Sequence, residues 1–189
     1  MPLPFLIVDA FAGKPFAGNP AAVVLQEKAL DEKEYLQFSS EFNLSETAFI
    51  LPVGRSSHKN ATRFSLRWFT PTVEVNLCGH ATLASCAALQ AFGNEADCFQ
   101  FETLSGLLKA IKNGKNWCLQ FPSNPPIEKD RNWHGEVTSS IFDDLQVVSK
   151  IFYSSATKKM IIILDEKLSV DFLRDLKVDS EKMFASCPR

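Results

Sequence analysis

The sequence predicts an α+β fold in which β-strands surround a buried helix. The main observation is a run of small and apolar residues from Ala81 to Phe92, which contains no charge and stops at Gly93. A helix that is apolar on every side has to be buried all round. At about 1.5 Å per residue this helix is far too short to cross a bilayer, so we expect protein around it and no membrane partner. Runs of β-forming residues on both sides of it in the sequence supply the strands.

The first strands and the first helix follow from local patterns. Asp31 followed by Glu34 is the pattern of a capping box, and aromatic residues then repeat at helical spacing, which predicts a helix over residues 31–42. Asn113-Gly114 between two apolar runs is the strongest short-range signal for a hairpin. We expect strands at residues 3–11, 21–25, 44–50, 66–69, 99–105, 107–112 and 117–121.

Proline-rich residues 122–126 and the charged stretch that follows them break regular structure. We therefore place a linker at residues 125–132, between a first domain at 1–124 and a second at 133–189. The second domain is expected to contain helices at 134–145 and 169–176 and strands at 147–153 and 159–164. A domain made of residues 133–189 alone is marginal in length for an independent two-layer domain, so we expect the second domain to be incomplete.

Length, composition and charge limit the classes of protein to consider. The 189 residues are 46% hydrophobic, which is ample for a packed core. With a net charge of −2 and a pI near 5.9, the chain lacks the basic stripe of a nucleic-acid binder, so no nucleic-acid partner is expected. Residues 1–8 lack the basic start and the length of a signal peptide, and the five Cys form no C-x-x-C pair. We expect a cytoplasmic protein with reduced thiols.

A set of longer motifs carries a family resemblance. In order, the motifs are Gly18-Asn19-Pro20, Asn43-Leu44-Ser45-Glu46-Thr47-Ala48-Phe49, Arg67-Trp68-Phe69-Thr70-Pro71, Glu74 and Leu77-Cys78-Gly79-His80-Ala81-Thr82. With them, the chain resembles the phenazine-biosynthesis-like (PhzF-type) isomerases. The resemblance implies the diaminopimelate-epimerase fold, in which two similar lobes each roll a sheet around a central helix, with the active site in the cleft between the lobes and often a homodimer.

The resemblance covers the first lobe fully and the second lobe only in part. Family members carry a Glu-Asp-Pro-x-Thr-Gly-Ser-like segment on the opposite wall of the cleft, and this sequence contains nothing similar. We therefore expect a complete first lobe and a truncated second lobe.

By this resemblance, Glu46 matches the family's acid/base residue, which moves a proton between carbons of an unsaturated cyclic amino acid in the bacterial pathway enzyme. Its apolar neighbours Leu44, Ala48 and Phe49 disfavour the charged carboxylate, which suits a group that both takes and gives a proton near neutral pH. The implied activity is a cofactor-independent isomerase that acts by proton transfer on a small carboxylate substrate. Without the resemblance, a lone Glu in a strand is more often a solvated edge charge.

The substrate is expected at the start of the central helix. Free backbone N–H groups and the positive end of the helix dipole favour an anion at Gly79 and His80. The His80 side chain would hydrogen-bond the carboxylate or a ring substituent of the substrate, although a capping or buried histidine is the alternative interpretation. Ser45 and Asn19 are expected to line the same pocket.

Two other functions stay open. A thiol beside a helix N-terminus has a lowered pKa, so Cys78 could serve a thiol-based epimerase or racemase, although those enzymes continue Cys-Gly-Asn where this chain has Cys-Gly-His. A truncated chain could instead be a binding or self-association module with exposed apolar surface. We expect Arg67 and Glu74 to form a structural pair only. The sequence has no nucleotide-binding glycine pattern and no metal-ligand spacing, so no cofactor and no metal site are expected.

Overall fold

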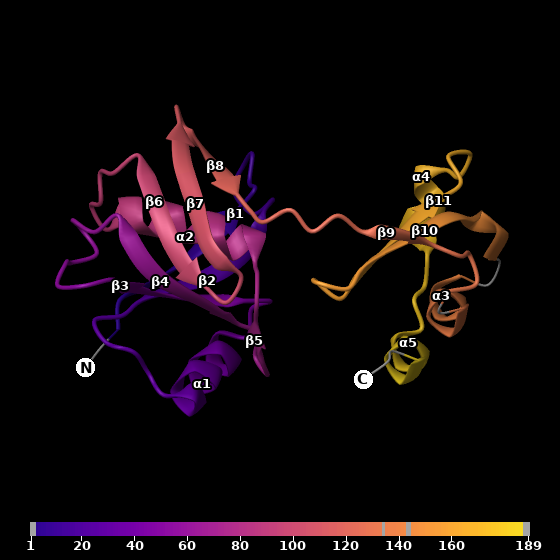
Figure 1. The fold of residues 1–189 in the computed structure, drawn as a ribbon, viewed down its shortest axis with the longest axis horizontal. Coiled ribbons are helices and arrows are strands. Elements are labelled where there is room, and N and C mark those ends of the chain that lie inside the picture. Colours follow the sequence, from indigo (N-terminus) through magenta and orange to yellow (C-terminus); the bar gives the residue numbers. More distant parts are fainter. Residues whose placement is uncertain (1–2, 134, 143–144, 187–189) are drawn as a thin grey trace. The chain divides into compact units, whose positions relative to one another are not determined.

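The computed structural model describes residues 3–133, 135–142 and 145–186. The chain divides into two units, Met1–Pro122 and Ser123–Arg189, each with its own sheet and helices (Figure 1). The residues predicted to form the site, from Asn19 to His80, all belong to the first unit. No helix among the described residues has the length and apolar character needed to cross a membrane.

The first unit is built on one mixed eight-stranded sheet with the order β1-β2-β3-β4-β6-β7-β8 and with β5 paired to β4 (Figure 1). The β2–β3 and β4–β6 pairs are parallel and the other pairs are antiparallel. The strands are β1 Phe5–Ala10, β2 Asn19–Leu25, β3 Thr47–Pro52, β4 Arg63–Phe69, β5 Glu74–Val75, β6 Cys98–Thr103, β7 Gly106–Asn113 and β8 Asn116–Gln120.

The helix α2, Gly79–Ala91, lies inside this sheet. It packs against β1, β2 and β3 and also against β8, so it contacts both end strands of the sheet. Strands spaced about 4.8 Å apart would make a flat sheet of this order roughly 29 Å wide, nearly three times the diameter of a helix. The sheet therefore has to roll around α2. Within the helix only Ala91 is exposed, which confirms the predicted α+β fold with a rolled sheet around a central buried helix.

The polar groups inside α2 are satisfied by the helix itself. The Thr82 hydroxyl donates to the Cys78 carbonyl at 2.6 Å, and the Ser85 hydroxyl donates to the Ala81 carbonyl at 2.7 Å. Such back-bonding lets small polar residues occupy a buried helix without leaving an unpaired group. The Thr82 and Ser85 hydroxyl groups can therefore be buried in the core together with the apolar side chains of α2.

The other helix of this unit, α1 at Glu32–Phe42, lies on the outer face of the sheet. Asp31 and Glu34 form the predicted capping box, since each side chain accepts a hydrogen bond from the backbone N–H of the other, at 2.7 and 2.9 Å. Tyr35 anchors the helix by stacking on Phe69 and meeting Phe49 edge to face. The helix ends at Asn43, whose left-handed conformation has φ 50°.

The predicted Asn-Gly hairpin joins β7 to β8. Asn113 and Asn116 are the last pair of its ladder, and Gly114 adopts φ +60° in the turn. A positive φ is strained for residues with a side chain, so Gly is the natural choice here.

The second unit contains a three-stranded antiparallel sheet in the order β11-β10-β9, with small helices. Its core is formed by Phe142, Val148 and Ile151. The elements are β9 Ile127–Lys129, α3 Gly135–Ile141, a short 3-10 helix Leu145–Val147, β10 Val148–Ser154, β11 Lys159–Leu164, α4 Val170–Asp175 and α5 Ser180–Ser186.

Two elements of the second unit differ from the prediction. Strand β9 falls within the stretch expected to be a linker, and α5 follows the last helix that was expected. The predicted helix at 134–145 corresponds to α3, while residues 134 and 143–144 lie outside the described residues.

Candidate functional site

The N-terminus of α2 lacks a side-chain cap. Cys78 occupies the N-cap position and makes no capping hydrogen bond with its side chain. The first N–H groups of any helix have no partner inside the helix, and a thiol sulfur is only a weak acceptor. This end of α2 therefore offers donors and a positive partial charge to an anion.

Four side chains meet at this helix end, and we call Ser45, Glu46, Cys78 and His80 the polar cluster. The His80 Nε2 atom lies 3.4 Å from the Ser45 Oγ atom and 3.5 Å from a Glu46 carboxylate oxygen. The other ring nitrogen, Nδ1, lies 3.3 Å from the Cys78 sulfur. His80 thus stands between a carboxylate and a hydroxyl on one side and a thiol on the other.

The alternation of strand β3 explains why Glu46 reaches the helix. Ala48 and Ile50 point into the core that contains α2, while Phe49 points to the opposite face, under α1. Side chains two residues apart share a face of a strand. Glu46, directly before β3, continues the inward series and meets His80 in the first turn of α2.

The cluster is neither sealed nor fully exposed. The side chain of His80 is 10% exposed and that of Glu46 is 22% exposed. Solvent screens a pair this buried less than it screens a surface pair. Both groups therefore keep some contact with solvent.

Two other predicted site residues, Asn19 and Gly79, are placed close by without joining the cluster. Asn19 is the first residue of β2, and the parallel pairing of Ala22 with Thr47 brings the starts of β2 and β3 side by side. No hydrogen bond joins Asn19 to the polar cluster among the described residues. At Gly79 a Cβ atom would meet only a Phe121 ring carbon at 3.8 Å, an ordinary contact. Packing therefore does not require this glycine, and its role in ligand approach stays a prediction.

The expected lowering of the Cys78 pKa is wrong. Burial is the largest influence and raises the pKa of this thiol to about 11, and the nearby Glu46 carboxylate raises it further. The backbone N–H groups of Ala81 and His80, which lie near the sulfur without making a capping hydrogen bond, lower the pKa only in part. Desolvation of the thiolate thus outweighs the favourable position at the helix N-terminus.

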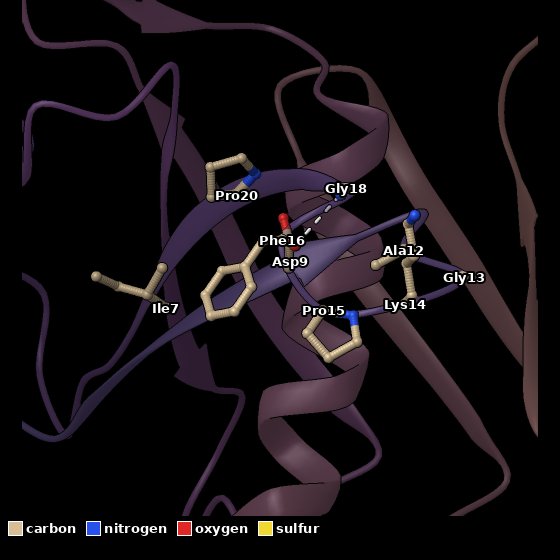
Figure 2. Close-up of a pocket in the computed structure, with 9 residues that line it drawn as sticks. All are labelled: Ile7, Asp9, Ala12, Gly13, Lys14, Pro15, Phe16, Gly18 and Pro20. Carbon is tan, nitrogen blue, oxygen red and sulfur yellow. Dashed lines mark hydrogen bonds between the residues drawn. The ribbon is translucent and has the colours of Figure 1, made fainter.

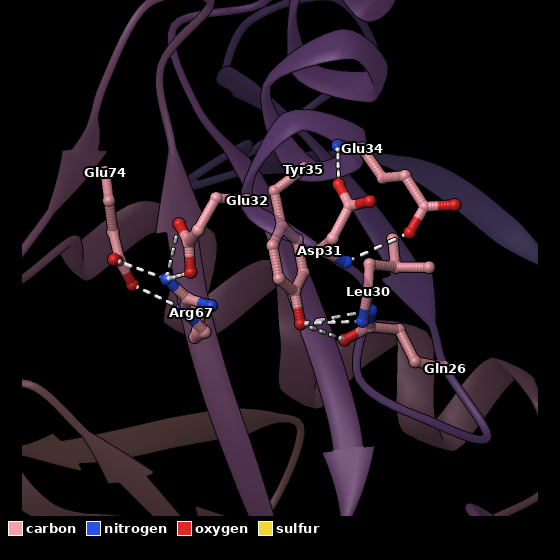
Figure 3. A network of polar contacts seen from close by, with 8 residues as sticks. All are labelled: Gln26, Leu30, Asp31, Glu32, Glu34, Tyr35, Arg67 and Glu74. Atoms are coloured by element: carbon pink, nitrogen blue, oxygen red, sulfur yellow. Dashed lines mark hydrogen bonds and ion pairs between the residues drawn. The ribbon is translucent and has the colours of Figure 1, made fainter.

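The Arg67–Glu74 pair forms as predicted and extends to a third element (Figure 3). Arg67 donates to both carboxylate oxygens of Glu74, at 2.7 and 2.6 Å, and to Glu32 at the start of α1 at 2.8 Å. Its guanidinium carbon lies 4.6 Å from the centre of the Tyr35 ring. The hydrogen bonds to Glu74 are the main cause that raises the pKa of Arg67 above its ordinary value. The network ties α1 to β4 and β5, and the link to Glu32 was not predicted.

A separate surface hollow of about 730 Å³ lies beside β1 (Figure 2). It is lined by Ile7, Asp9, Ala12, Gly13, Lys14, Pro15, Phe16, Gly18 and Pro20, and includes no member of the polar cluster. Gly18 donates its N–H to the Asp9 carboxylate at 3.2 Å, and a Cβ atom on Gly18 would lie 2.4 Å from the Ala10 carbonyl oxygen. Only glycine fits there, which explains the Gly in the Gly-Asn-Pro motif by packing alone.

Comparison with known proteins adds independent information. The family model PhzC-PhzF, described as phenazine biosynthesis-like protein, matches residues 8–189. Phenazine biosynthesis-like domain-containing protein 1 of Mus musculus is 42% identical over 185 residues, which cover 97% of this chain and 64% of that protein. An uncharacterized isomerase of Halalkalibacterium halodurans is 42% identical over 132 residues, covering 69% of this chain and 47% of that protein.

A solved structure agrees with these relatives. A phenazine biosynthesis protein of the PhzF family from Enterococcus faecalis is similar with a TM-score of 0.75 and 31% identity, covering 96% of this chain and 64% of that one. The chain therefore spans just under two thirds of the length of the mouse relative and of this structure.

Proposed function

The chain belongs to the PhzC-PhzF family of phenazine biosynthesis-like proteins, and we propose that it is an isomerase that moves a proton on a small carboxylate substrate without a cofactor. The observation that carries this proposal is the meeting of Glu46, Ser45 and His80 at the uncapped start of α2. Relatives described as isomerases support the reaction class.

The start of α2 is the proposed binding place for the substrate carboxylate. The backbone N–H groups of Gly79 and His80 would donate to the carboxylate oxygens, and the helix dipole would add a favourable charge. In this proposal the substrate's neighbouring carbons would face Glu46, since the Glu46 carboxylate lies 3.5 Å from the ring of the same His80. Binding and proton transfer would thus share one end of one helix.

Glu46 is the proposed proton carrier. Its carboxylate takes a proton from a carbon next to an unsaturated system, so a C–H bond breaks, a carboxyl O–H bond forms and the electron pair enters the conjugated system of the substrate. The carboxyl group then returns the proton to a different carbon of that system, which moves the double bond and restores the carboxylate. No electrons are gained or lost overall, so the step needs no redox partner.

His80 is proposed to orient Glu46. A Cys78 thiol whose burial raises its pKa to about 11 keeps its proton at neutral pH, and in this proposal it donates that proton to Nδ1 of His80. The ring proton then sits on Nε2, which points to the Glu46 carboxylate and the Ser45 hydroxyl. An imidazole with its proton on Nε2 would hold Glu46 by a hydrogen bond and still leave the carboxylate free to accept a proton.

A thiol-based epimerase is a weaker candidate. It requires a thiolate at neutral pH, whereas burial raises the pKa of Cys78 to about 11. The alternative of a binding or self-association module predicts no proton exchange with any small acid in the experiment below.

The test is proton exchange with solvent. Small unsaturated carboxylic and cyclic amino acids are incubated with the chain in D₂O, and loss of the C–H signals next to the double bond is followed by NMR. We expect exchange with the wild-type chain and at least about a hundredfold slower exchange with Glu46→Gln, since general acid/base groups typically contribute 10²–10⁴-fold. Glu32→Gln, on α1, is the matched control. Equal exchange by wild type and Glu46→Gln would overturn the assignment.

We further propose that the protein works as a cytoplasmic homodimer. Free thiols at Cys78, Cys86, Cys98 and Cys118 support a reducing compartment, and the exposed apolar side chains Phe5 and Ile7 on the edge strand β1 offer a surface for association. Sedimentation analysis tests the oligomeric state, and a purely monomeric chain at high concentration would contradict it.

A further inference from the structure

We propose that Glu46, Cys78 and His80 form a binding site for one thiophilic divalent cation such as Zn²⁺. One possible ligand atom from each of the three side chains lies within 4.8 Å of the other two. The proposal goes beyond the isomerase function, because it needs neither a substrate nor turnover. It also departs from the sequence-based expectation of no metal site.

The three ligand types suit zinc. Thiolate sulfur, imidazole nitrogen and carboxylate oxygen bind Zn²⁺ at about 2.0–2.3 Å, so tetrahedral ligand atoms lie roughly 3.3–3.8 Å from one another. The Cys78 sulfur and the His80 Nδ1 atom are already 3.3 Å apart. Glu46 would have to close the remaining distance by rotation of its side chain, which is 22% exposed.

His80 can give only one of its nitrogens to a single ion. Nδ1 lies on the side of Cys78, and Nε2 lies on the side of Glu46. An ion on Nδ1 would leave Nε2 beside the Ser45 hydroxyl, 3.4 Å away, as an outer partner that fixes the ring. We therefore place the ion on the Nδ1 side, between the thiol and the imidazole.

Charge balance favours the ion at this depth. On binding, the ion would displace the thiol proton of Cys78 into solvent, and the resulting thiolate and the carboxylate of Glu46 together neutralise a divalent cation. Cys78 is only 7% exposed. Buried charges are tolerated when they are paired or coordinate a metal. Three protein ligands leave the fourth tetrahedral position open, as in zinc sites that bind an exchangeable ligand.

A bound cation would also affect the proton transfer proposed above, and this consequence rests on that proposed function. A cation held by Glu46 occupies the carboxylate that would carry the proton. Zn²⁺ would then inhibit proton exchange, and a chelator would restore it.

The test is a titration of the reduced full-length chain with Cd²⁺, a zinc substitute whose bond to a thiolate gives ultraviolet charge-transfer absorption. We expect saturation at one Cd²⁺ per chain. Cys78→Ser should abolish the absorption and weaken binding at least about tenfold to a hundredfold, because even outer-shell changes have effects of this size. Glu46→Gln and His80→Gln should keep the absorption and weaken binding.

The matched control is the double variant Cys98→Ser/Cys118→Ser, which removes the thiols on β6 and β8 and should bind Cd²⁺ like the wild type. Retained absorption in Cys78→Ser, or its loss in the double variant, would overturn the proposal and place the ion on another thiol.

Serine is a preferred N-cap residue, so Cys78→Ser is expected to fold, which circular dichroism checks. Zn²⁺ should raise the Tm of the wild type and not that of Cys78→Ser. Cd²⁺ binding by a chain that shows no proton exchange when it is free of metal would reject the isomerase and leave the metal site standing.

Discussion

Helices α1 and α2 of the first unit begin in opposite ways. At α1, Asp31 and Glu34 exchange hydrogen bonds in a complete capping box, so the free N–H groups of the helix are largely satisfied. At α2, Cys78 provides no such bond. The difference teaches that side chains satisfy the start of α1 from within the helix, whereas the start of α2 has no side-chain cap and is where we propose that a ligand binds.

The two helices also differ in their surroundings. α1 covers the outside of the sheet and is held by Tyr35 and by the ion pair of Glu32 with Arg67. α2 is enclosed by the rolled sheet and brings His80 to Glu46. The helix that carries His80 is thus mostly buried, whereas α1 lies on the outer face of the sheet.

The largest expected effect compares core packing around the two helices. Leu89 of α2 is 0% exposed, so Leu89→Ala leaves a cavity and should lower the free energy of unfolding by about 2–5 kcal/mol. Leu36 of α1 is only partly buried, and Leu36→Ala should cost clearly less. Urea unfolding of both variants measures the difference. Equal losses would show that α2 is not the centre of the core.

The next effect is a loss of folding stability at alkaline pH. Its cause is the buried thiol of Cys86 on α2. Burial raises the pKa of Cys86 to about 12 from 9.0, so the unfolded chain loses the thiol proton at lower pH than the folded chain. The stabilising contribution is complete below pH 9 and is lost as the pH rises through the folded value. Raising the pH from 8 to about 10.5 should cost on the order of 2 kcal/mol.

The control for this prediction is Cys86→Ala, which lacks the thiol. Its stability should decline less steeply with pH than that of the wild type, when both are measured by urea unfolding. Parallel pH profiles for the two proteins would contradict the assignment, since other groups that titrate in this range are common to both.

The smallest effect tests the caps themselves. Asp31→Ala removes the N-cap of α1 and should lower the free energy of unfolding by about 1 kcal/mol. Cys78→Ser introduces a capping oxygen at α2 and should leave stability unchanged or slightly higher. Thermal unfolding of both variants compares them. A loss for Cys78→Ser as large as that for Asp31→Ala would mean that the cysteine already acts as a cap.

Local sequence patterns predicted most elements of the first unit. The capping box at Asp31, the charge-free run after Ala81 and the Asn113-Gly114 turn depend on neighbours within a few residues, and all three are confirmed. The second unit was predicted less completely. Strand β9, Ile127–Lys129, is short and lies among prolines and charges, and its identity comes from pairing with β10, which no local pattern shows.

Site residues were named from motifs, and their arrangement came from the fold. The motifs pointed to Ser45, Glu46, Gly79 and His80, but nothing in the spacing showed that Glu46 contacts His80 or that Cys78 contacts the same ring. The link from Arg67 to Glu32 was missed for the same reason, because it joins two elements far apart in the sequence.

By itself, the sequence determined most of the helices and strands of the first unit and that one helix must be buried, and its motifs singled out the side chains of the polar cluster. Only the tertiary structure decided that the carboxylate of Glu46 and the thiol of Cys78 meet on opposite sides of His80, and that the thiol keeps a raised pKa. The physical reason is one of range. Propensity, capping and periodicity act over a few residues, whereas burial and contact depend on how the sheet rolls around α2.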